Sequence, residues 1–404
     1  MKTTLLALIA ALALTLPAGA QQTGAGDQPS AVPADQPTPT AQKDGVVGRL
    51  KGYINKDKSG TEERDPEPEG FYPRIGGLTT GSGIALGAGY RAHFVDRAFY
   101  ADLSAIVSTK RYLGVDARLR VPSPAPERLE LWTSVAFRRF PQEDYFGLGD
   151  AALLTNRSNY GIQSVDYGGQ AIVHVTPIWD VGTGVGYFTP SIRAGNDTNF
   201  PSIELLFTDV TAPGLAEQPD FLHYGLFTAL DYRGQRGNPR NGGYYRASLA
   251  QWNDQSMNAY DFRRFDAEVN QYVSLGRPRH VLVGRVGVSY VNNALGERVP
   301  FYVFPYVGGA NTVRSFREFR FRDENTMFLS GEYRLGVHKY VQLVGFLDGG
   351  KVAGNWEDLT AGALRKGYGG GVRAGTESRT FVRFDIGTGG GEGTRYFLKF
   401  FPSF

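Results

Sequence analysis

The chain has 404 residues, among them 53 glycines, 22 tyrosines and 26 phenylalanines, and it contains no cysteine. The lack of cysteine excludes a disulfide framework and any site built on thiol or cysteine–metal chemistry. The formal net charge is only +3, which is too small to predict nucleic-acid binding. A composition rich in glycine and aromatic residues is typical of strands that are apolar on one face only.

The first twenty residues have the layout of a secretory signal peptide. A positive Lys2 is followed by an apolar run and then by the small residues AGA, which end at Ala20. The run has about a dozen residues, fewer than the roughly 20 that a membrane-spanning helix needs. We therefore predict a signal peptide over residues 1–20, cleaved near Ala20, and export of the remaining chain.

The segment 21–70 is rich in Gln, Pro, Thr, Gly and Asp, as in DQPSAVPADQPTPT and EERDPEPEG. Such a composition has too few apolar residues to bury a core. We predict a largely disordered periplasmic linker here, followed by one folded domain over residues 71–404.

From Phe71 onward the sequence alternates with a period of two, which indicates β-strands. In residues 113–121 every second residue is apolar or alanine, and the intervening positions include Asp116, Arg118 and Arg120. Water-soluble sandwiches also alternate, but charges on the polar face of many strands favour a barrel with a wet interior. The pattern predicts sixteen strands, at residues 71–79, 84–94, 98–108, 112–121, 128–139, 160–174, 179–189, 221–233, 243–253, 259–274, 280–292, 326–337, 341–352, 366–376, 380–387 and 394–404.

The predicted connections fall into two size classes. If the first strand starts at the periplasm, the turns on that side are short, whereas the opposite connections 140–159, 190–220, 293–325 and 353–365 are long. Short periplasmic turns and long external loops are typical of outer-membrane barrels. We predict an all-β, sixteen-stranded antiparallel transmembrane β-barrel in the outer membrane of a Gram-negative bacterium, in contact with lipid and lipopolysaccharide. We expect it to be a monomer.

Other residues complete this interpretation. The last predicted strand is aromatic and ends at Phe404, as in barrels that are handed to an outer-membrane assembly machinery. Glycine-rich residues 387–394 lack the ending of a phosphate loop, so we predict a flexible loop.

Two further sets of residues are assigned by their position in the predicted strands and connections. We expect aromatic residues at the membrane interfaces, namely Tyr100, Tyr145, Phe146 and Trp179. We expect a polar lining of the barrel interior, formed by Arg118, Arg120, Arg263, Arg264, Asp266, Glu268, Arg285, Arg383 and Asp385.

The stretch GGANTVRSF, with Gly308, Gly309, Val313, Arg314 and Phe316, resembles the sixth-loop motif of the BamA/TamA-like barrels, also called the bacterial surface antigen family. That motif has two glycines, a short spacer and then Val-Arg-Gly followed by Phe or Tyr. Two downstream stretches also resemble the family: SGEYRLGV, with Glu332, and GFLDGG, with Asp348.

The resemblance implies that the long sixth loop folds into the barrel lumen and that Arg314 pairs with Glu332 and Asp348. Strand parity agrees, because it places both acidic residues on the inward face, and arginine can bind carboxylates with two parallel hydrogen bonds. One residue departs from the motif: Ser315 replaces a glycine. If that glycine needs a positive φ, the serine carries a strain cost.

The resemblance also implies a function in protein insertion into the outer membrane or translocation across it, with client proteins as partners and without enzymatic activity or cofactor. Members with these functions usually carry periplasmic POTRA modules, and segment 21–70 is too short for one. No metal-ligand spacing links the five histidines. The implied mechanism is a weak seam between the first and last strands, marked by Gly76, Gly77 and Pro402. Two alternatives remain, a gated pore plugged by the sixth loop and a mainly structural surface barrel.

Overall fold

The computed structural model describes residues 69–76, 78–276, 279–293 and 296–400. The predicted signal peptide and nearly all of the predicted linker lie outside these residues, as do Gly77, Pro402 and Phe404. No helix in the described part of the chain is both long and apolar enough to cross a bilayer.

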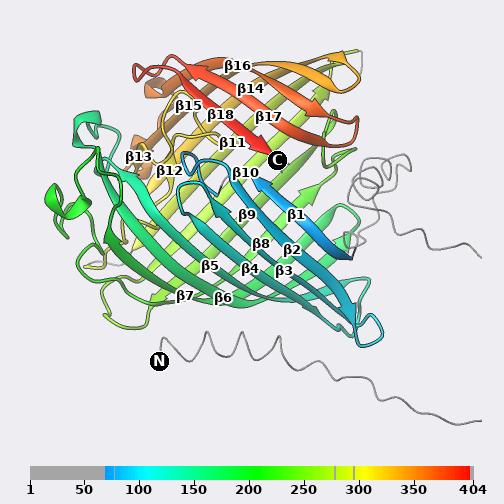
Figure 1. The fold of residues 1–404 in the computed structure, drawn as a ribbon, viewed down its shortest axis with the longest axis horizontal. Coiled ribbons are helices and arrows are strands. Elements are labelled where there is room, and N and C mark those ends of the chain that lie inside the picture. The colour runs from blue at the N-terminus through cyan, green and yellow to red at the C-terminus, as the bar shows by residue number, and fades with distance from the viewer. Residues whose placement is uncertain (1–68, 77, 277–278, 294–295, 401–404) are drawn as a thin grey trace, which may run out of the picture. The chain divides into compact units, whose positions relative to one another are not determined.

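The described residues form one antiparallel sheet of sixteen strands, hydrogen-bonded in chain order and curved into a nearly closed barrel (Figure 1). The predicted strand number is confirmed. The strands are β1 Gly70–Gly76, β2 Ala85–Phe94, β3 Phe99–Ser108, β4 Leu113–Val121, β5 Leu129–Tyr145, β6 Ser158–Thr176, β7 Trp179–Ala194, β8 Phe221–Asp231, β9 Gly242–Asp254, β10 Phe262–Ser274, β11 His280–Asn293, β14 Asn325–His338, β15 Val341–Ala353, β16 Arg365–Gly375, β17 Thr380–Thr388 and β18 Arg395–Phe400.

Between β11 and β14 the chain makes a separate two-residue ladder of β12 Tyr306–Val307 with β13 Phe321–Arg322. The residues that connect β12 to β13 include the GGANTVRSF stretch. This hairpin therefore gives the predicted sixth loop an ordered base.

Two strands, β5 and β7, extend at least five residues beyond their predicted ends. The prediction ended the fifth strand at residue 139, but β5 pairs with β6 as far as Tyr145, across an irregularity between Phe140 and Glu143. Likewise, β7 continues to Ala194. The sequence here is too polar to face lipid, but the backbone ladder does not need lipid-facing side chains, so it continues past the apolar band.

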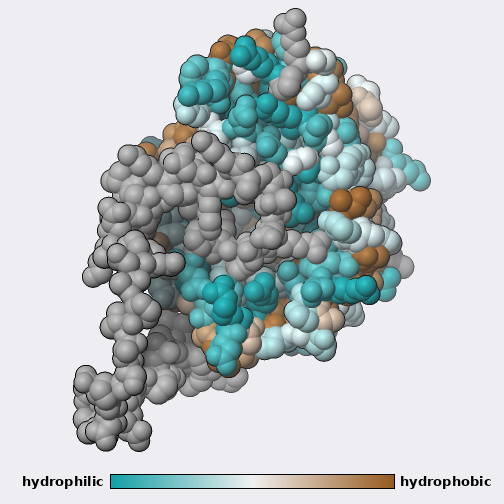
Figure 2. All heavy atoms as spheres, turned by 90° about the vertical axis from the view of Figure 1, so that its right-hand side faces the viewer, coloured by the Kyte–Doolittle hydropathy of each residue, from teal (hydrophilic) through white to brown (hydrophobic). Residues whose placement is uncertain are grey.

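Burial in the barrel is the reverse of that in a soluble protein. Leu103 on β3 and Leu347 on β15 are 51% and 69% exposed, whereas Glu332 on β14 and Asp348 on β15 are at most 6% exposed. In Figure 2, which faces the short-turn end of Figure 1, hydrophilic residues dominate the visible described surface and hydrophobic ones gather mainly toward its margins. An apolar outer surface around a polar interior is the arrangement expected of a membrane barrel.

The long connections and the strand ends next to them form a buried apolar core. The rings of Tyr145 and Tyr160 each lie 4.9 Å from the ring of Phe301, which is fully buried. Tyr145 and Phe146 are 0% and 1% exposed, so their assignment to the membrane interface was wrong. Both residues lie in the predicted connection 140–159, where the local sequence gave no sign that the distant loop residue Phe301 packs against Tyr145.

The two edges of the sheet are β1 and β18, which lie close together in Figure 1. Among the described residues no ladder joins them. The barrel therefore has one discontinuity in its hydrogen-bonded wall, which we call the seam.

The outward face of β3 provides a test of the membrane assignment. Replacing Leu103 by Arg should lower the free energy of unfolding in phospholipid vesicles by about 2–4 kcal/mol, because the charge would enter the hydrocarbon. Leu206, in the connection before β8, is 50% exposed, and the same substitution there should change stability by less than about 0.5 kcal/mol. Equal losses in urea titrations would contradict the assignment.

Candidate functional site

The turn that presents Arg314 is built on two glycines. Gly308 and Gly309 have φ values of 123° and 85°, which residues with a Cβ rarely adopt. A Cβ on Gly308 would also lie 2.0 Å from the carbonyl oxygen of Arg317. The turn is closed by a hydrogen bond of 3.1 Å from the Gly309 amide to the Phe316 carbonyl. The glycine pair of the motif is therefore required by the backbone.

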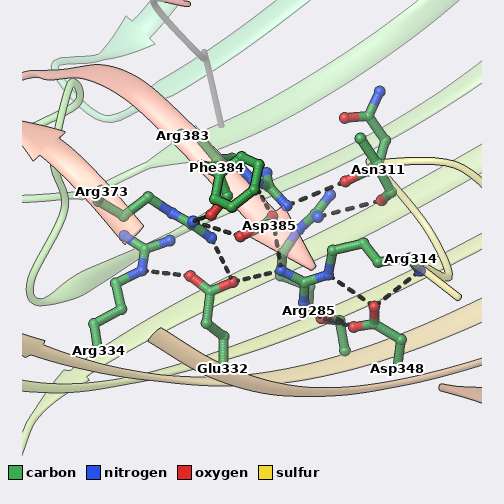
Figure 3. Close-up of polar contacts among 12 residues, drawn as sticks. Arg285, Asn311, Arg314, Glu332, Arg334, Asp348, Arg373, Arg383, Phe384 and Asp385 are labelled. Atoms are coloured by element: carbon green, nitrogen blue, oxygen red, sulfur yellow. Dashed lines mark hydrogen bonds and ion pairs between the residues drawn. The ribbon is translucent and has the colours of Figure 1, made fainter. Parts of the chain in front are cut away.

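Arg314 is 2% exposed and binds acceptors on three strands (Figure 3). Its Nε and Nη2 donate to the two oxygens of Asp348, each at 2.8 Å, and its Nη1 donates to Glu332 Oε2 at 2.8 Å. Further bonds run from Nη2 to Ser330 Oγ at 3.1 Å and from Nη1 to Asp385 Oδ2 at 3.4 Å. These five contacts match the five N–H groups of a guanidinium.

Strand register explains why these acceptors meet. Ser330 on β14 is directly opposite Asp348 on β15, and Glu332 is two residues further along β14 on the same face. Glu332 is opposite Phe346, whose ring lies under the guanidinium of Arg314 with 3.4 Å from Cζ to the ring centroid. The backbone amide of Arg314 also donates to Asp348, at 3.1 Å.

The ion pairs of Arg314 with Glu332 and Asp348 belong to a larger buried cluster. Glu332 also accepts from Arg334 at 2.7 Å and from Arg373 at 3.1 Å, and Asp385 binds Arg373 and Arg383, each at 2.6 Å. With Arg314 and Asp348, the cluster has four arginines and three carboxylates, a formal charge of 4 − 3 = +1, and every member is at most 6% exposed. Such a network tolerates the loss of one partner poorly, because a charge is then left buried and unpaired.

The sequence identified this cluster only in part. Asp385 and Arg383 were predicted as general lining, although their position on one face of the same strand could have indicated a third acid. Arg373 was missed, because it follows a glycine run, GYGGG, that has no alternation to assign its face. The predicted trio Arg314, Glu332 and Asp348 lies together in the structure.

The remaining motif residues form a small apolar core. Val313 and Phe316 are 0% and 2% exposed and pack with Val307, Phe321 and Val352. Ser315 is buried and is absent from the residues with positive φ, so the strain expected there does not arise.

A residue with positive φ does occur nearby, at Phe319, with a φ of 60°. Left-handed backbone costs roughly 1–2 kcal/mol for a residue with a Cβ. The Phe319 ring packs 4.5 Å from the ring of Tyr306 in a T-shaped contact, which offsets part of that cost.

Residues 308–320, which connect β12 to β13 and which we call the Arg314 segment, contact both sides of the seam. On one side, Glu318 accepts a hydrogen bond of 2.6 Å from the amide of Thr80, which follows β1. On the other side, Asn311 accepts a hydrogen bond from Lys399 on β18, and Arg320 pairs with Glu392 in the connection between β17 and β18.

Of the predicted seam residues, only Gly76 is described. It ends β1 opposite Ala85, and a Cβ placed there would meet no atom within 4 Å. Crowding therefore gives no reason for this glycine. Gly77, Pro402 and Phe404 lie outside the described residues, so their predicted roles stay predictions. Among the described residues no group of three His, Cys, Asp or Glu side chains is arranged to hold a metal.

Comparison with known proteins identifies the family. A family model, the Omp85 superfamily domain, matches residues 90–393. The chain belongs to the Omp85 superfamily. This confirms the resemblance to BamA/TamA-like barrels on which the site was predicted. No curated protein sequence matches the chain.

Two solved structures show the same fold as this Omp85 chain. A structure of BamA from Haemophilus ducreyi lacking POTRA domains 1–3 is 14% identical, with a TM-score of 0.62 over 83% of this chain and 70% of that chain. CdiB from Escherichia coli is 12% identical, with a TM-score of 0.52 over 80% of this chain, which spans 59% of the CdiB chain. Barrels of this family are outer-membrane proteins of Gram-negative bacteria.

The cluster predicts a large effect of Arg314 on stability. Replacing Arg314 by Ala should lower the free energy of unfolding by about 3–5 kcal/mol, because Asp348 loses its bidentate partner while it stays buried. Replacing it by Lys should cost less, since the charge is kept while the planar fork is lost. Urea unfolding in vesicles, followed by tryptophan fluorescence, measures both variants.

A loop ion pair provides the control. Arg298 pairs with Asp209 at 2.7 Å, but its side chain is 43% exposed. Replacing Arg298 by Ala should cost no more than about 1 kcal/mol. Equal losses in the Arg298 and Arg314 variants would contradict the prediction that the buried network stabilises the barrel more than an exposed ion pair does.

Proposed function

We propose that this Omp85 barrel acts in the outer membrane, inserting proteins into it or translocating them across it through local opening of the seam between β1 and β18. The observation that carries this proposal is the pair of contacts that the Arg314 segment makes across the seam, to Thr80 beyond β1 and to Lys399 on β18. One ordered segment thus contacts the edge strand β18 and the connection that follows the other edge strand, β1. We propose that it lies within the lumen and holds the two edges together.

The length of β1 supports a weak seam. At about 3.3 Å per residue, its seven residues span roughly 23 Å along the strand. A tilt of about 40° reduces this to roughly 18 Å across the membrane, less than the apolar band of about 25 Å that such barrels present. The bilayer next to β1 would have to become thinner, which lowers the barrier to inserting another strand there.

The unpaired edges support the same mechanism. Edge strands expose backbone N–H and C=O groups that can pair with an added strand. A client protein that extends a strand along β1 would satisfy these groups within the membrane, where an unsatisfied group is costly. The partners proposed are therefore an unfolded or extended client chain, outer-membrane lipid and lipopolysaccharide.

Engineered disulfides test the opening of the seam, and the cysteine-free chain makes them specific. Outward-facing Ile75 on β1 is replaced by Cys together with Cys at Tyr396 or Leu398 on β18. The oxidised, cross-linked barrel should lose most of its activity in the insertion of an unfolded outer-membrane barrel into vesicles, because the seam can no longer separate. Reduction should restore that activity.

A cross-link within the wall is the matched control. Ile386 on β17 is the ladder partner of Tyr396, so a disulfide between these positions joins strands that are already paired. It should leave insertion unchanged. Full insertion activity in the oxidised β1–β18 variants, with the cross-link verified by mass spectrometry, would contradict the proposed mechanism.

A further inference from the structure

At the short-turn end of the barrel, the connection between β8 and β9 reaches toward distant strands. Asn238 Nδ2 donates to the carbonyl of Thr376 at 3.0 Å, and the Thr380 amide donates to the carbonyl of Gly237 at 3.0 Å. Thr376 and Thr380 flank the turn between β16 and β17, and these strands are the fifth and sixth from β9 in the sheet. The connection therefore forms a strap, residues 232–241, across this end of the polar interior.

A cavity of about 130 Å³ lies under the strap. Five of its lining side chains are cationic and one is a carboxylate, a formal charge of 5 − 1 = +4 with histidine neutral. These six residues are Arg240, Arg279, Arg334, Lys339, Arg373 and Glu377. Glu332 and Asp385 pair with Arg334 and Arg373 from outside this lining, which reduces the local excess to 5 − 3 = +2. A concave site with an excess of positive charge focuses the electrostatic potential and attracts anions.

The buried arginines of this cavity already hold the nearby acids. The Nη atoms of Arg373 bind Asp385 and Glu332, and Arg334 Nε binds the other oxygen of Glu332. The Nε–H groups of Arg373 and Arg240 are nevertheless buried without an acceptor among the described residues. Arg373 is 2% exposed, and a buried N–H without an acceptor is costly.

The one lining carboxylate can be displaced. Glu377 lies 3.7 Å from Arg240 Nη2, and its side chain is 75% exposed. A contact this long on an exposed side chain contributes little to stability. An incoming anion could therefore replace Glu377 at Arg240 without breaking a buried ion pair.

We propose that this cavity is a binding site for a phosphate group. A tetrahedral phosphate offers several acceptor oxygens, which matches a site with several cationic donors, and arginine binds phosphate with planar, bidentate geometry. The phosphate belongs either to a free ion or to a lipid headgroup. This site is separate from the seam, so its occupancy does not depend on the function proposed above.

Calorimetric titration of the detergent-purified full chain with inorganic phosphate, in a buffer free of other multivalent anions, tests the site. Arg240→Gln should weaken binding by about tenfold or more, because it removes a charge-assisted donor. Glu377→Gln should tighten binding by about threefold, because it removes the competing carboxylate. Titration with short-chain phosphatidic acid identifies the source: a lipid headgroup should bind much more tightly than inorganic phosphate, and a free ion should not.

Arg236→Gln is the control, since Arg236 is on the same strap, outside the residues that line the cavity, and pairs with Asp231 at 3.0 Å. It removes the same charge and should change phosphate binding less than about twofold. Equal weakening by Arg236→Gln and Arg240→Gln would show a diffuse field in place of a site and overturn the proposal. Absence of binding at millimolar phosphate would also overturn it. Glu377→Gln alters an exposed side chain, so it tests the site even if Arg240→Gln fails to fold.

Discussion

The guanidinium of Arg314 lies where water cannot solvate it, so each of its N–H groups needs an acceptor from the protein. All of these acceptors come from three strands, β14, β15 and β17. They are Ser330, Glu332, Asp348 and Asp385. This requirement fixes the turn that carries Arg314 to within the tolerance of a hydrogen bond. A partly withdrawn turn would leave buried carboxylates unpaired, so intermediate positions are unfavourable and the docked position is sharply defined.

The attachment of this segment to the barrel is unequal on the two sides of the seam. On the side of β18 it is held by the Arg314 cluster, by Arg383, which donates to the Ala310 carbonyl, and by Lys399. On the side of β1, the hydrogen bond that the described residues place there joins Glu318 to Thr80. If the seam opens as proposed, the contacts among the described residues favour release of β1 first, while β18 and the segment stay together. Such an order would leave the edge of β1 available to another strand.

The sequence predicted the elements whose signal is local and missed those that depend on distant neighbours. Sixteen strands and the inward faces of Glu332 and Asp348 follow from alternation, because the period of a strand fixes the face of each residue. The burial of Tyr145 depends on Phe301, more than 150 residues further along the chain, and no local pattern encodes that contact. Arg373 was missed for a related reason, since glycines remove the alternation that would have shown its direction.

The glycines beside the Arg314 turn have a steric role that their local sequence does not reveal. Gly387 lies within β17, as the predicted strand 380–387 requires, and a Cβ there would come within 2.1 Å of the Arg314 carbonyl oxygen. Similarly, a Cβ on Gly367 of β16 would lie 2.2 Å from Ser315 Oγ. The lack of side chains on these strands creates the space that the segment occupies. The glycines of β16 and β17 and the arginine of the turn are thus parts of one fit, because Arg314 can reach its carboxylates only if its backbone lies against a bare strand.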